Sequence, residues 1–306
     1  MDPQGTTAAP ILVFAHPDDP FAETLKGTAN EDTVRIWQPA DLVEIGWSVT
    51  FDPHPEVRLT DRRRAQTWES GEMAGIWFQA LPPLARIDGL DERDRQYVIA
   101  EIRSSLAAVW HAAACPIIGQ PASEPVNAAL GPGPEARIAM HRLGLPTVST
   151  HLGIRRIHAL QAAGKAVRLT ALDTNASHWL ESAIDPEDGA KQEDEVAIAV
   201  DDRIVRVVAI LGEDLRIFVA QPDGSIHRAG PTSDDNDLAD YIRAATHLDL
   251  ALAFCCRQRG AWRIVRLSTQ LPWWLASIDD TACWFASWLA ERCRPSRQMA
   301  MGEHRP

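Results

Sequence analysis

The amino-acid sequence predicts an α/β protein of about two domains. The chain has 306 residues, and protein domains usually have roughly 100–200 residues each. Its hydrophobic share is 45% and its charged share 24%, an ordinary balance for a protein with a buried core. Near the start, the apolar run 11–15 is followed by a turn and an apolar helical stretch. This order of strand, turn and helix is typical of α/β layers.

The first 120 residues predict alternating strands and helices. An aspartate before a proline supplies a helix N-cap after the strand at 11–15, and the helix itself is expected at 21–28. The clearest helix covers 91–114, where apolar residues recur at helical spacing and the acidic start suits the helix dipole. Further strands are expected at 34–37, 75–78 and 116–118, with a hairpin over 46–60.

The stretch 119–134 is rich in glycine and proline and predicts a linker. Helices at 135–143 and 154–163, strands at 145–150 and 166–172, and an acidic loop at 173–194 are expected after it. Beyond these we expect strands at 196–200, 204–211, 215–220, 248–255 and 262–267, a solvated loop at 221–237, and helices at 238–245 and 280–292. The division we predict is an N-terminal α/β domain at 1–120, a linker and small central lobe at 121–200, and a C-terminal lobe at 201–306.

The charge and cysteine content narrow the class of partner and the compartment. Thirty Lys and Arg stand against 42 Asp and Glu, a formal net charge of −12, so we expect no binding to nucleic acid. The apolar runs are too short to span a bilayer, and we expect no membrane contact. Five cysteines spread over a long chain fit a reducing compartment, so we expect a cytoplasmic protein.

One short motif suggests metal chemistry. His16, Pro17, Asp18 and Asp19 follow the first strand, and histidine with two carboxylates in one loop is a set that zinc accepts. The run resembles the His-Pro-Asp-Asp-Glu signature of LmbE-like zinc deacetylases, with Pro20 at the glutamate position. A turn followed by a helix cap explains the same residues, and both interpretations stay open.

The order of segments along nearly the whole chain resembles that of another family. These are the ATP-grasp ligases, in particular the graspetide synthetases that macrocyclise ribosomal peptides and are related to RimK. The segments that carry the resemblance are 11–19, 75–79, 116–121, 144–150, 205–208, 248–256 and 262–272. The resemblance implies an ATP-grasp-like fold with α+β lobes behind an N-terminal pre-ATP-grasp α/β domain.

The departures from the family pattern concern the residues that hold ATP and magnesium. The resemblance implies an aspartate at the end of one strand and a Glu-x-Asn on the next, which here fall on Cys256 and on Arg266 and Ser268. A thiol is a poor ligand for magnesium, and a guanidinium repels it. One of the two expected phosphate-binding lysines is replaced by Arg168, and the other falls in 131–134, where no lysine occurs.

The resemblance therefore implies a degenerate ATP/Mg site with neither catalytic residues nor a metal. Arg168, Arg206 and Arg266 are the candidates for binding a nucleotide or substrate. We expect a pseudoenzyme without cofactor, acting as a peptide-binding or scaffolding subunit in ribosomal peptide biosynthesis. Its expected partners are a precursor peptide and a partner biosynthetic enzyme, in a homo- or hetero-oligomer such as a dimer. The alternatives are an active ATP-dependent carboxylate–amine or carboxylate–hydroxyl ligase, which would use ATP and magnesium, and the zinc deacetylase.

Overall fold

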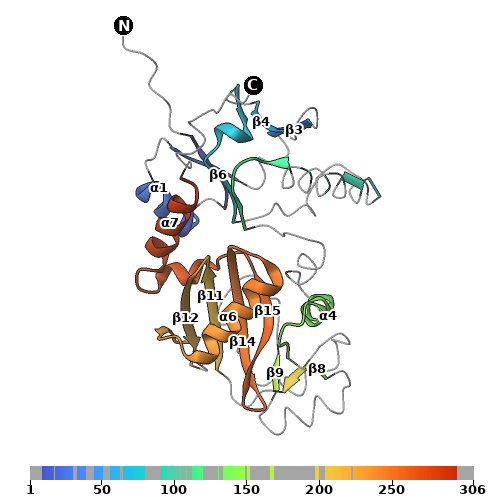
Figure 1. The fold of residues 1–306 in the computed structure, drawn as a ribbon, viewed down its shortest axis with the longest axis vertical. Coiled ribbons are helices and arrows are strands. Elements are labelled where there is room, and N and C mark those ends of the chain that lie inside the picture. The colour runs from blue at the N-terminus through green and yellow to red at the C-terminus, as the bar shows by residue number, and fades with distance from the viewer. Residues whose placement is uncertain are drawn as a thin grey trace, which may run out of the picture. The chain divides into compact units, whose positions relative to one another are not determined.

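The structure is a computed structural model. It describes residues 9–16, 18–29, 33–38, 45–50, 56–62, 65–79, 91, 93–94, 97–98, 101, 104, 108, 112–119, 130, 134–148, 150–151, 166–168, 197–199, 204–221 and 223–294. By its contacts the chain forms two compact units, one made of Met1–Gln120 with Ala282–Pro306 and the other of Pro121–Thr281. The fold is the predicted mixture of helices and sheets (Figure 1).

A parallel sheet of order β2-β1-β6-β7 forms the centre of the first unit. Its strands are β1 (Ile11–Phe14), β2 (Val34–Trp37), β6 (Gly75–Phe78) and β7 (Ile117–Ile118). All residues of β1 and β6 are buried, as expected for apolar runs at the middle of a parallel sheet. Helix α1 (Pro20–Thr28) connects β1 to β2. The predicted strand–turn–helix opening is confirmed.

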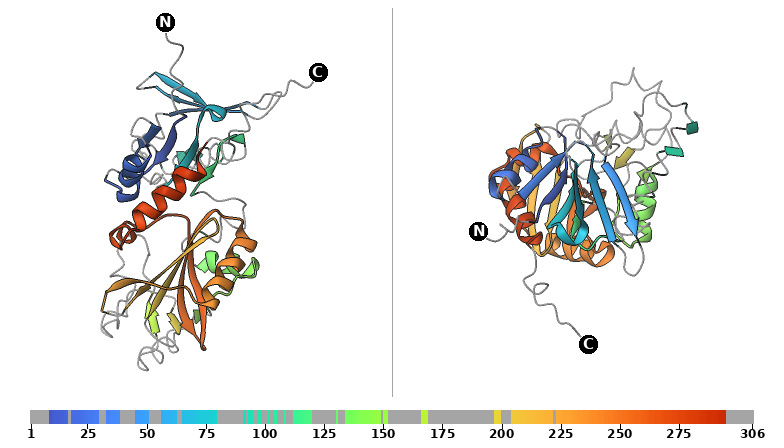
Figure 2. Two further views of the ribbon diagram at one scale, coloured as in Figure 1. Left: turned by 60° about the vertical axis from the view of Figure 1, so that its left-hand side comes forward. Right: turned by 90° about the horizontal axis from the view of Figure 1, so that it is seen from above.

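An antiparallel sheet of order β3-β4-β5 and the last helix complete this unit. Strands β3 (Ile45–Thr50) and β4 (Glu56–Asp61) form the predicted hairpin, while β5 (Gln66–Glu69) and the short 3₁₀ helix η3 (Ser70–Glu72) were not predicted. Helix α7 (Thr281–Arg292) returns to this unit from the far end of the chain (Figure 2). The ring of its Phe285 lies 4.7 Å from that of Trp77 and 5.6 Å from that of Phe21.

The second unit contains a five-stranded antiparallel sheet of order β13-β12-β11-β14-β15. Its strands are β11 (Val205–Leu211), β12 (Asp214–Ala220), β13 (Ile226–Ala229), β14 (Leu250–Gln258) and β15 (Ala261–Ser268). Residues 146–148 run parallel to β15, bridged at Thr147 and Ile264. Two further elements are the small sheet β8-β10-β9, made of Thr150–His151, Ala197–Ala199 and Ala166–Arg168, and the 3₁₀ helix η5 (Trp273–Ser277).

Helices α4 (Pro134–Arg142) and α6 (Ser233–Thr246) pack on one face of the five-stranded sheet, which we call the helix-side face (Figure 1). Met140 of α4 and Ala239 and Ile242 of α6 are fully buried in the same cluster as alternate residues of the sheet. Those sheet residues are Val208, Ile210, Ile217, Ala251, Ala253, Cys255, Ile264 and Leu267. Because side chains alternate along a strand, the residues between them face the other way, onto what we call the second face.

The predicted loop at 221–237 is wrong. It contains strand β13 and the first turn of α6, which begins before the expected residue 238. Thr232 and Asp235 form a capping box there, in which the Thr232 N–H and hydroxyl both donate to Asp235 Oδ2 at 2.7 Å. Aspartate at this position stabilises a helix start, and an acidic run with no apolar periodicity hides that role.

Parts of the prediction lie outside the described residues, namely the helix at 154–163 and the acidic loop at 173–194. The described positions between 93 and 112 are all helical, in agreement with the helix expected at 91–114. In the part of the chain that the structure describes, no helix has the length and apolar content needed to cross a bilayer.

The substitution Gly119→Ala tests whether the close approach of Gly119 to the backbone of β6 requires a glycine. Gly119 has φ +82°, and an added Cβ would overlap the carbonyl oxygen of Phe78. Gly224→Ala is the matched control, because Gly224 has φ +83° and open space around it. Left-handed backbone alone costs about 1–2 kcal/mol, so the control should lose that much in urea unfolding. Gly119→Ala should lose at least about twice as much; equal losses would show that the overlap has no energetic consequence.

Candidate functional site

Arg206, a predicted nucleotide- or substrate-binding residue, is held in an ion pair on the helix-side face. Its guanidinium donates to Asp235 Oδ2 at 2.6 Å, with 13% of the Arg206 side chain and 1% of the Asp235 side chain exposed. The guanidinium carbon also lies 5.4 Å from the ring centroid of Trp262, within the range of a cation–π contact. Arg206 thus links strand β11 to the start of α6.

Arg266 lies on the second face. In the hairpin of β14 and β15 it is paired with Phe254, and Ser268 is paired with Leu252. Cys256 is instead paired with Arg263. Since Leu252 is four positions before Cys256, the register separates Cys256 from Ser268 by roughly 13 Å along the strands. Phe254 is therefore directly opposite Arg266, and Ser268 and Cys256 each lie two positions from this pair, in opposite directions along the hairpin.

This set does not fit magnesium or a magnesium-bound triphosphate. Phe254 has no donor atom, and the guanidinium of Arg266 carries the same sign of charge as the ion. The Ser268 hydroxyl accepts from the Gln270 N–H at 3.0 Å and donates to the Gln270 carbonyl oxygen at 3.2 Å. Magnesium requires an octahedral set of oxygen ligands. Among the described residues, no group of three or more His, Cys, Asp or Glu side chains could hold a metal ion.

A second arginine on the same face is already neutralised. Arg216, paired with Ala209 of β11, donates to both carboxylate oxygens of Asp280 at 2.6 and 3.0 Å. These hydrogen bonds hold the pKa of Asp280 below its usual range. The second face therefore carries guanidinium groups where a metal site would need carboxylates.

Arg168 and the adjacent cysteines Cys255 and Cys256 were also singled out in the sequence. Arg168 lies on β9 opposite Ala197 of β10, and its side chain is outside what the structure describes, as are residues 131–133. The adjacent thiols of Cys255 and Cys256 are both buried, and burial raises the pKa of Cys255 well above its usual range. A raised pKa makes the buried Cys255 thiol a poor nucleophile.

The proposed zinc loop is a helix cap. Asp19 Oδ1 accepts from the Phe21 and Ala22 N–H groups at 3.0 Å each, and Oδ2 accepts from Gln79 Nε2 at 3.1 Å. Burial raises the pKa of this carboxyl above its usual range. Because both oxygens of Asp19 are engaged, the geometry supports the cap and not the zinc deacetylase.

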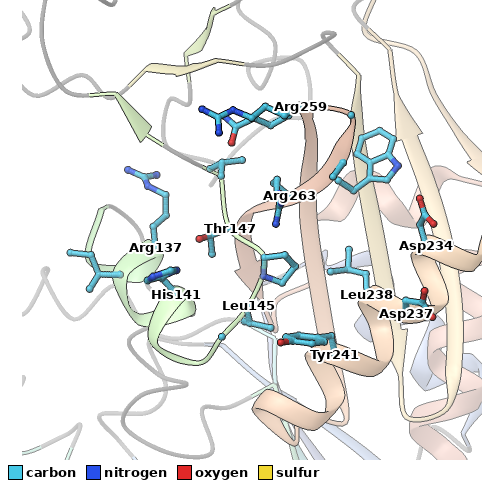
Figure 3. Close-up of a pocket in the computed structure, with 18 residues that line it drawn as sticks. Arg137, His141, Leu145, Thr147, Asp234, Asp237, Leu238, Tyr241, Arg259 and Arg263 are labelled. Carbon is cyan, nitrogen blue, oxygen red and sulfur yellow. The ribbon is translucent and has the colours of Figure 1, made fainter.

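A cavity lined by described residues lies elsewhere, on the helix-side face (Figure 3). Its volume is about 1120 Å³, and we call it the α4–α6 cavity. It is lined by Arg137, Ile138 and His141 of α4, residues 144–148, Asp234, Asp237, Leu238 and Tyr241 of α6, and residues 258–263 of the β14–β15 hairpin. Leu145 and Leu238 are buried and give it an apolar floor.

The cavity has two walls of opposite charge. Figure 3 shows Asp234 and Asp237 on the α6 side, with Arg137 and His141 on the α4 side. The sequence did not predict this site, because its residues come from segments far apart in the chain and Asp234 and Asp237 were assigned to a loop. The one signal that could have found them is the acidic start of α6 itself.

The comparisons with known proteins agree with this architecture. No family model matches the sequence, and no curated protein matches it. Among solved structures, the chain is similar to the macrocyclase MdnC of Microcystis aeruginosa bound with precursor peptide MdnA, at TM-score 0.63 and 14% identity, covering 92% of this chain and 98% of that one. A RiPP-associated ATP-grasp ligase of Chryseobacterium gregarium, in complex with ADP and a leader and core peptide, matches at TM-score 0.61 and 12% identity, covering 92% and 96%.

A third similar structure is a RimK domain protein of the ATP-grasp type from Sphaerobacter thermophilus, at TM-score 0.51 and 14% identity, covering 94% of this chain and all of that one. The chain thus has an ATP-grasp-like fold over almost its whole length. At these identities the likeness concerns the fold, and function has to be argued from the site.

Replacing Arg206 tests whether it serves the fold. Arg206→Ala leaves the buried Asp235 carboxylate without its cation, and we expect a loss of about 3 kcal/mol in the free energy of unfolding. The control is Arg228→Ala, which removes an exposed guanidinium that lies 3.3 Å from Asp280 and should cost under about 1 kcal/mol. If Arg206→Ala unfolds like the wild type in urea, Arg206 does not anchor α6.

Asp19 gives a prediction for stability and pH. Asp19→Ala should destabilise the protein by about 1–2 kcal/mol, whereas Asp19→Asn keeps a capping oxygen and should cost less. The pKa of Asp19 is raised in the folded state. At pH values just above the usual pKa of aspartate, the folded protein therefore keeps a proton on Asp19 that the unfolded protein has released. Wild-type stability relative to Asp19→Asn should therefore fall as pH rises through that window and recover on acidification.

Urea unfolding at several pH values checks both statements about Asp19. The exposed neighbour Asp18, at φ 64°, provides the control Asp18→Asn, because asparagine tolerates left-handed backbone. A control that loses as much stability as Asp19→Ala would contradict the assignment of the cap to Asp19.

Proposed function

We propose that the protein is a peptide-binding subunit of ribosomal peptide biosynthesis that does not itself carry out ATP-dependent ligation. The observation that carries the proposal is the pairing of Phe254 with Arg266 on the second face, with Ser268 two positions further along β15. The resemblance to ATP-grasp ligases puts the magnesium ligands on these two strands. Their replacement removes the carboxylates while the surrounding sheet is kept.

The positive charge of Arg266 opposes the binding of a magnesium ion beside it. Phosphoryl transfer depends on neutralising the charge of the triphosphate by metal ions and cationic side chains held in position. A guanidinium 4 Å from a bound cation would cost about 4 kcal/mol per unit charge at an effective dielectric constant of 20. The metal would then have to bind against repulsion, with no carboxylate at Phe254 or Arg266 to offset it.

Support for a peptide partner comes from the structural relatives. MdnC is bound with a precursor peptide, and the Chryseobacterium ligase holds a leader and a core peptide. The present chain covers nearly all of each of them and has a large cavity on the helix-side face. In this proposal it presents a precursor peptide to a separate enzyme that performs the chemistry, as a homo- or hetero-oligomer.

Calorimetry with ATP, in the presence of magnesium and then of EDTA, tests whether the protein lacks a functional site for magnesium and ATP. We expect no magnesium-dependent heat of binding up to about 1 mM ATP, and no ADP released when a peptide mixture is added. An ATP-grasp ligase measured in the same buffer serves as the positive control. Saturable, magnesium-dependent ATP binding would contradict the proposal and favour the active ligase, whose magnesium ligands would then lie elsewhere.

A further inference from the structure

The rim of the α4–α6 cavity carries unusually exposed apolar side chains. Ile138 of α4 is 56% exposed and Tyr241 of α6 is 54% exposed, and both line the cavity. They are two of the four large hydrophobic side chains that are exposed in the described part of the chain. Apolar groups gathered at the edge of a concave site mark a binding surface rather than a random surface.

The side chains of the acidic wall take no part in the capping box of α6. Asp235 alone forms the capping box with Thr232 and the ion pair with Arg206. Within the described ranges, Asp234 and Asp237 make no side-chain hydrogen bond or ion pair. Both carboxylates line the cavity and can therefore meet a positively charged group of a ligand.

Three arginines supply the basic part of the lining. Arg137 stands on α4, and Arg259 and Arg263 belong to the β14–β15 hairpin. Arg259 and Gly260 form the two-residue turn with φ of 55° and 79°, and two positive φ values suit the twist of a hairpin. The turn defines the backbone conformation from which Arg259 projects.

These features exclude most ligand classes. A polyanion such as a nucleotide would meet Asp234 and Asp237, and a polycation would meet the arginines. The volume, about 1120 Å³, is at or above the upper end for small-molecule sites, which is roughly 300–1,000 Å³. A short peptide segment carrying both signs of charge and an apolar centre satisfies all three parts of the cavity.

We infer that the α4–α6 cavity binds a peptide segment in which apolar residues separate a basic end from an acidic end. The apolar residues lie over Leu145 and Leu238 between Ile138 and Tyr241. The basic end faces Asp234 and Asp237, and the acidic end faces Arg137 and Arg259. This assignment rests on the proposed function, since it names the recognition chemistry of the peptide partner.

Fluorescence anisotropy with four labelled synthetic decapeptides tests the inference, using the full chain in buffer with EDTA. The first peptide has two lysines and two glutamates on either side of a leucine–alanine centre. The second has the same composition with the charges interleaved, and the third and fourth carry four lysines or four glutamates. We expect the first to bind at least about fivefold more tightly than each of the others, as two ion pairs of surface strength allow.

Charge reversal separates recognition from folding. Asp234→Lys with Asp237→Lys should weaken the first peptide roughly tenfold and strengthen the four-glutamate peptide. The matched control is Asp240→Lys on the same helix, because Asp240 is 75% exposed, pairs with Arg243 and does not line the cavity. Tyr241→Ser should weaken all peptides with an apolar centre. Circular dichroism confirms that each variant is folded.

Three results would overturn the inference. They are equal binding of the first and the interleaved peptide, equal effects of the cavity and control substitutions, and no saturable binding of the first peptide up to about 1 mM. Magnesium-dependent ATP binding together with the expected peptide pattern would contradict the proposed loss of ligation and leave the assignment of the cavity standing. If ATP does not bind and the expected order of peptide affinities is not observed, the assignment of the cavity is contradicted, while the proposed loss of ligation stands.

Discussion

The register of the β14–β15 hairpin is the constraint on which the site depends. The two-residue turn at Arg259 and Gly260 sets Gln258 opposite Ala261. A bulge then leaves Val265 without a partner, because Cys255 is paired with Ile264 and Phe254 with Arg266. If Val265 were instead paired with Phe254, Arg266 would be paired with Ala253 and would lie on the helix-side face, since a slip of one position turns every side chain to the other face. The bulge therefore decides that Arg266 lies on the second face.

On the other side of the same sheet, one buried ion pair positions α6. Arg206 reaches from β11 to Asp235, which also caps the helix through Thr232. A buried carboxylate is tolerated only when its charge and hydrogen-bonding capacity are satisfied, and here three donors share a single oxygen. The consequence is a helix whose start is fixed against the sheet. Asp234 and Asp237, its neighbours in the first turns, are then held at the edge of the cavity.

The fold class could be predicted from the sequence because it depends on apolar periodicity and on turn residues. The run at 11–15, the helix after Asp19 and the strands around 205–220 and 250–268 were predicted close to their observed bounds. The sequence was not sufficient for the site, which depends on pairing between strands. Cys256 and Arg266 were both assigned to the degenerate metal site, and the hairpin pairs Arg266 with Phe254 and Cys256 with Arg263. The bulge in β15 that sets this pairing carries no clear signal in the sequence. Arg206 was expected to bind a ligand, since an arginine on a strand looks the same whether its partner is a phosphate or Asp235.

The candidate metal positions and the packing of α4 and α6 lie on opposite faces of this sheet, so the proposed loss of ligation requires no change in how those helices pack. Phe254, Arg266 and Ser268 lie on one face, whereas the helices and the α4–α6 cavity belong to the other. Substituting a metal ligand on the second face removes a catalytic group without altering the apolar residues that hold α4 and α6. The proposed binding surface on the helix-side face is thus compatible with a second face that carries Phe254 and Arg266. The stability of the sheet, which comes from its alternating buried residues, does not depend on which of the two functions remains.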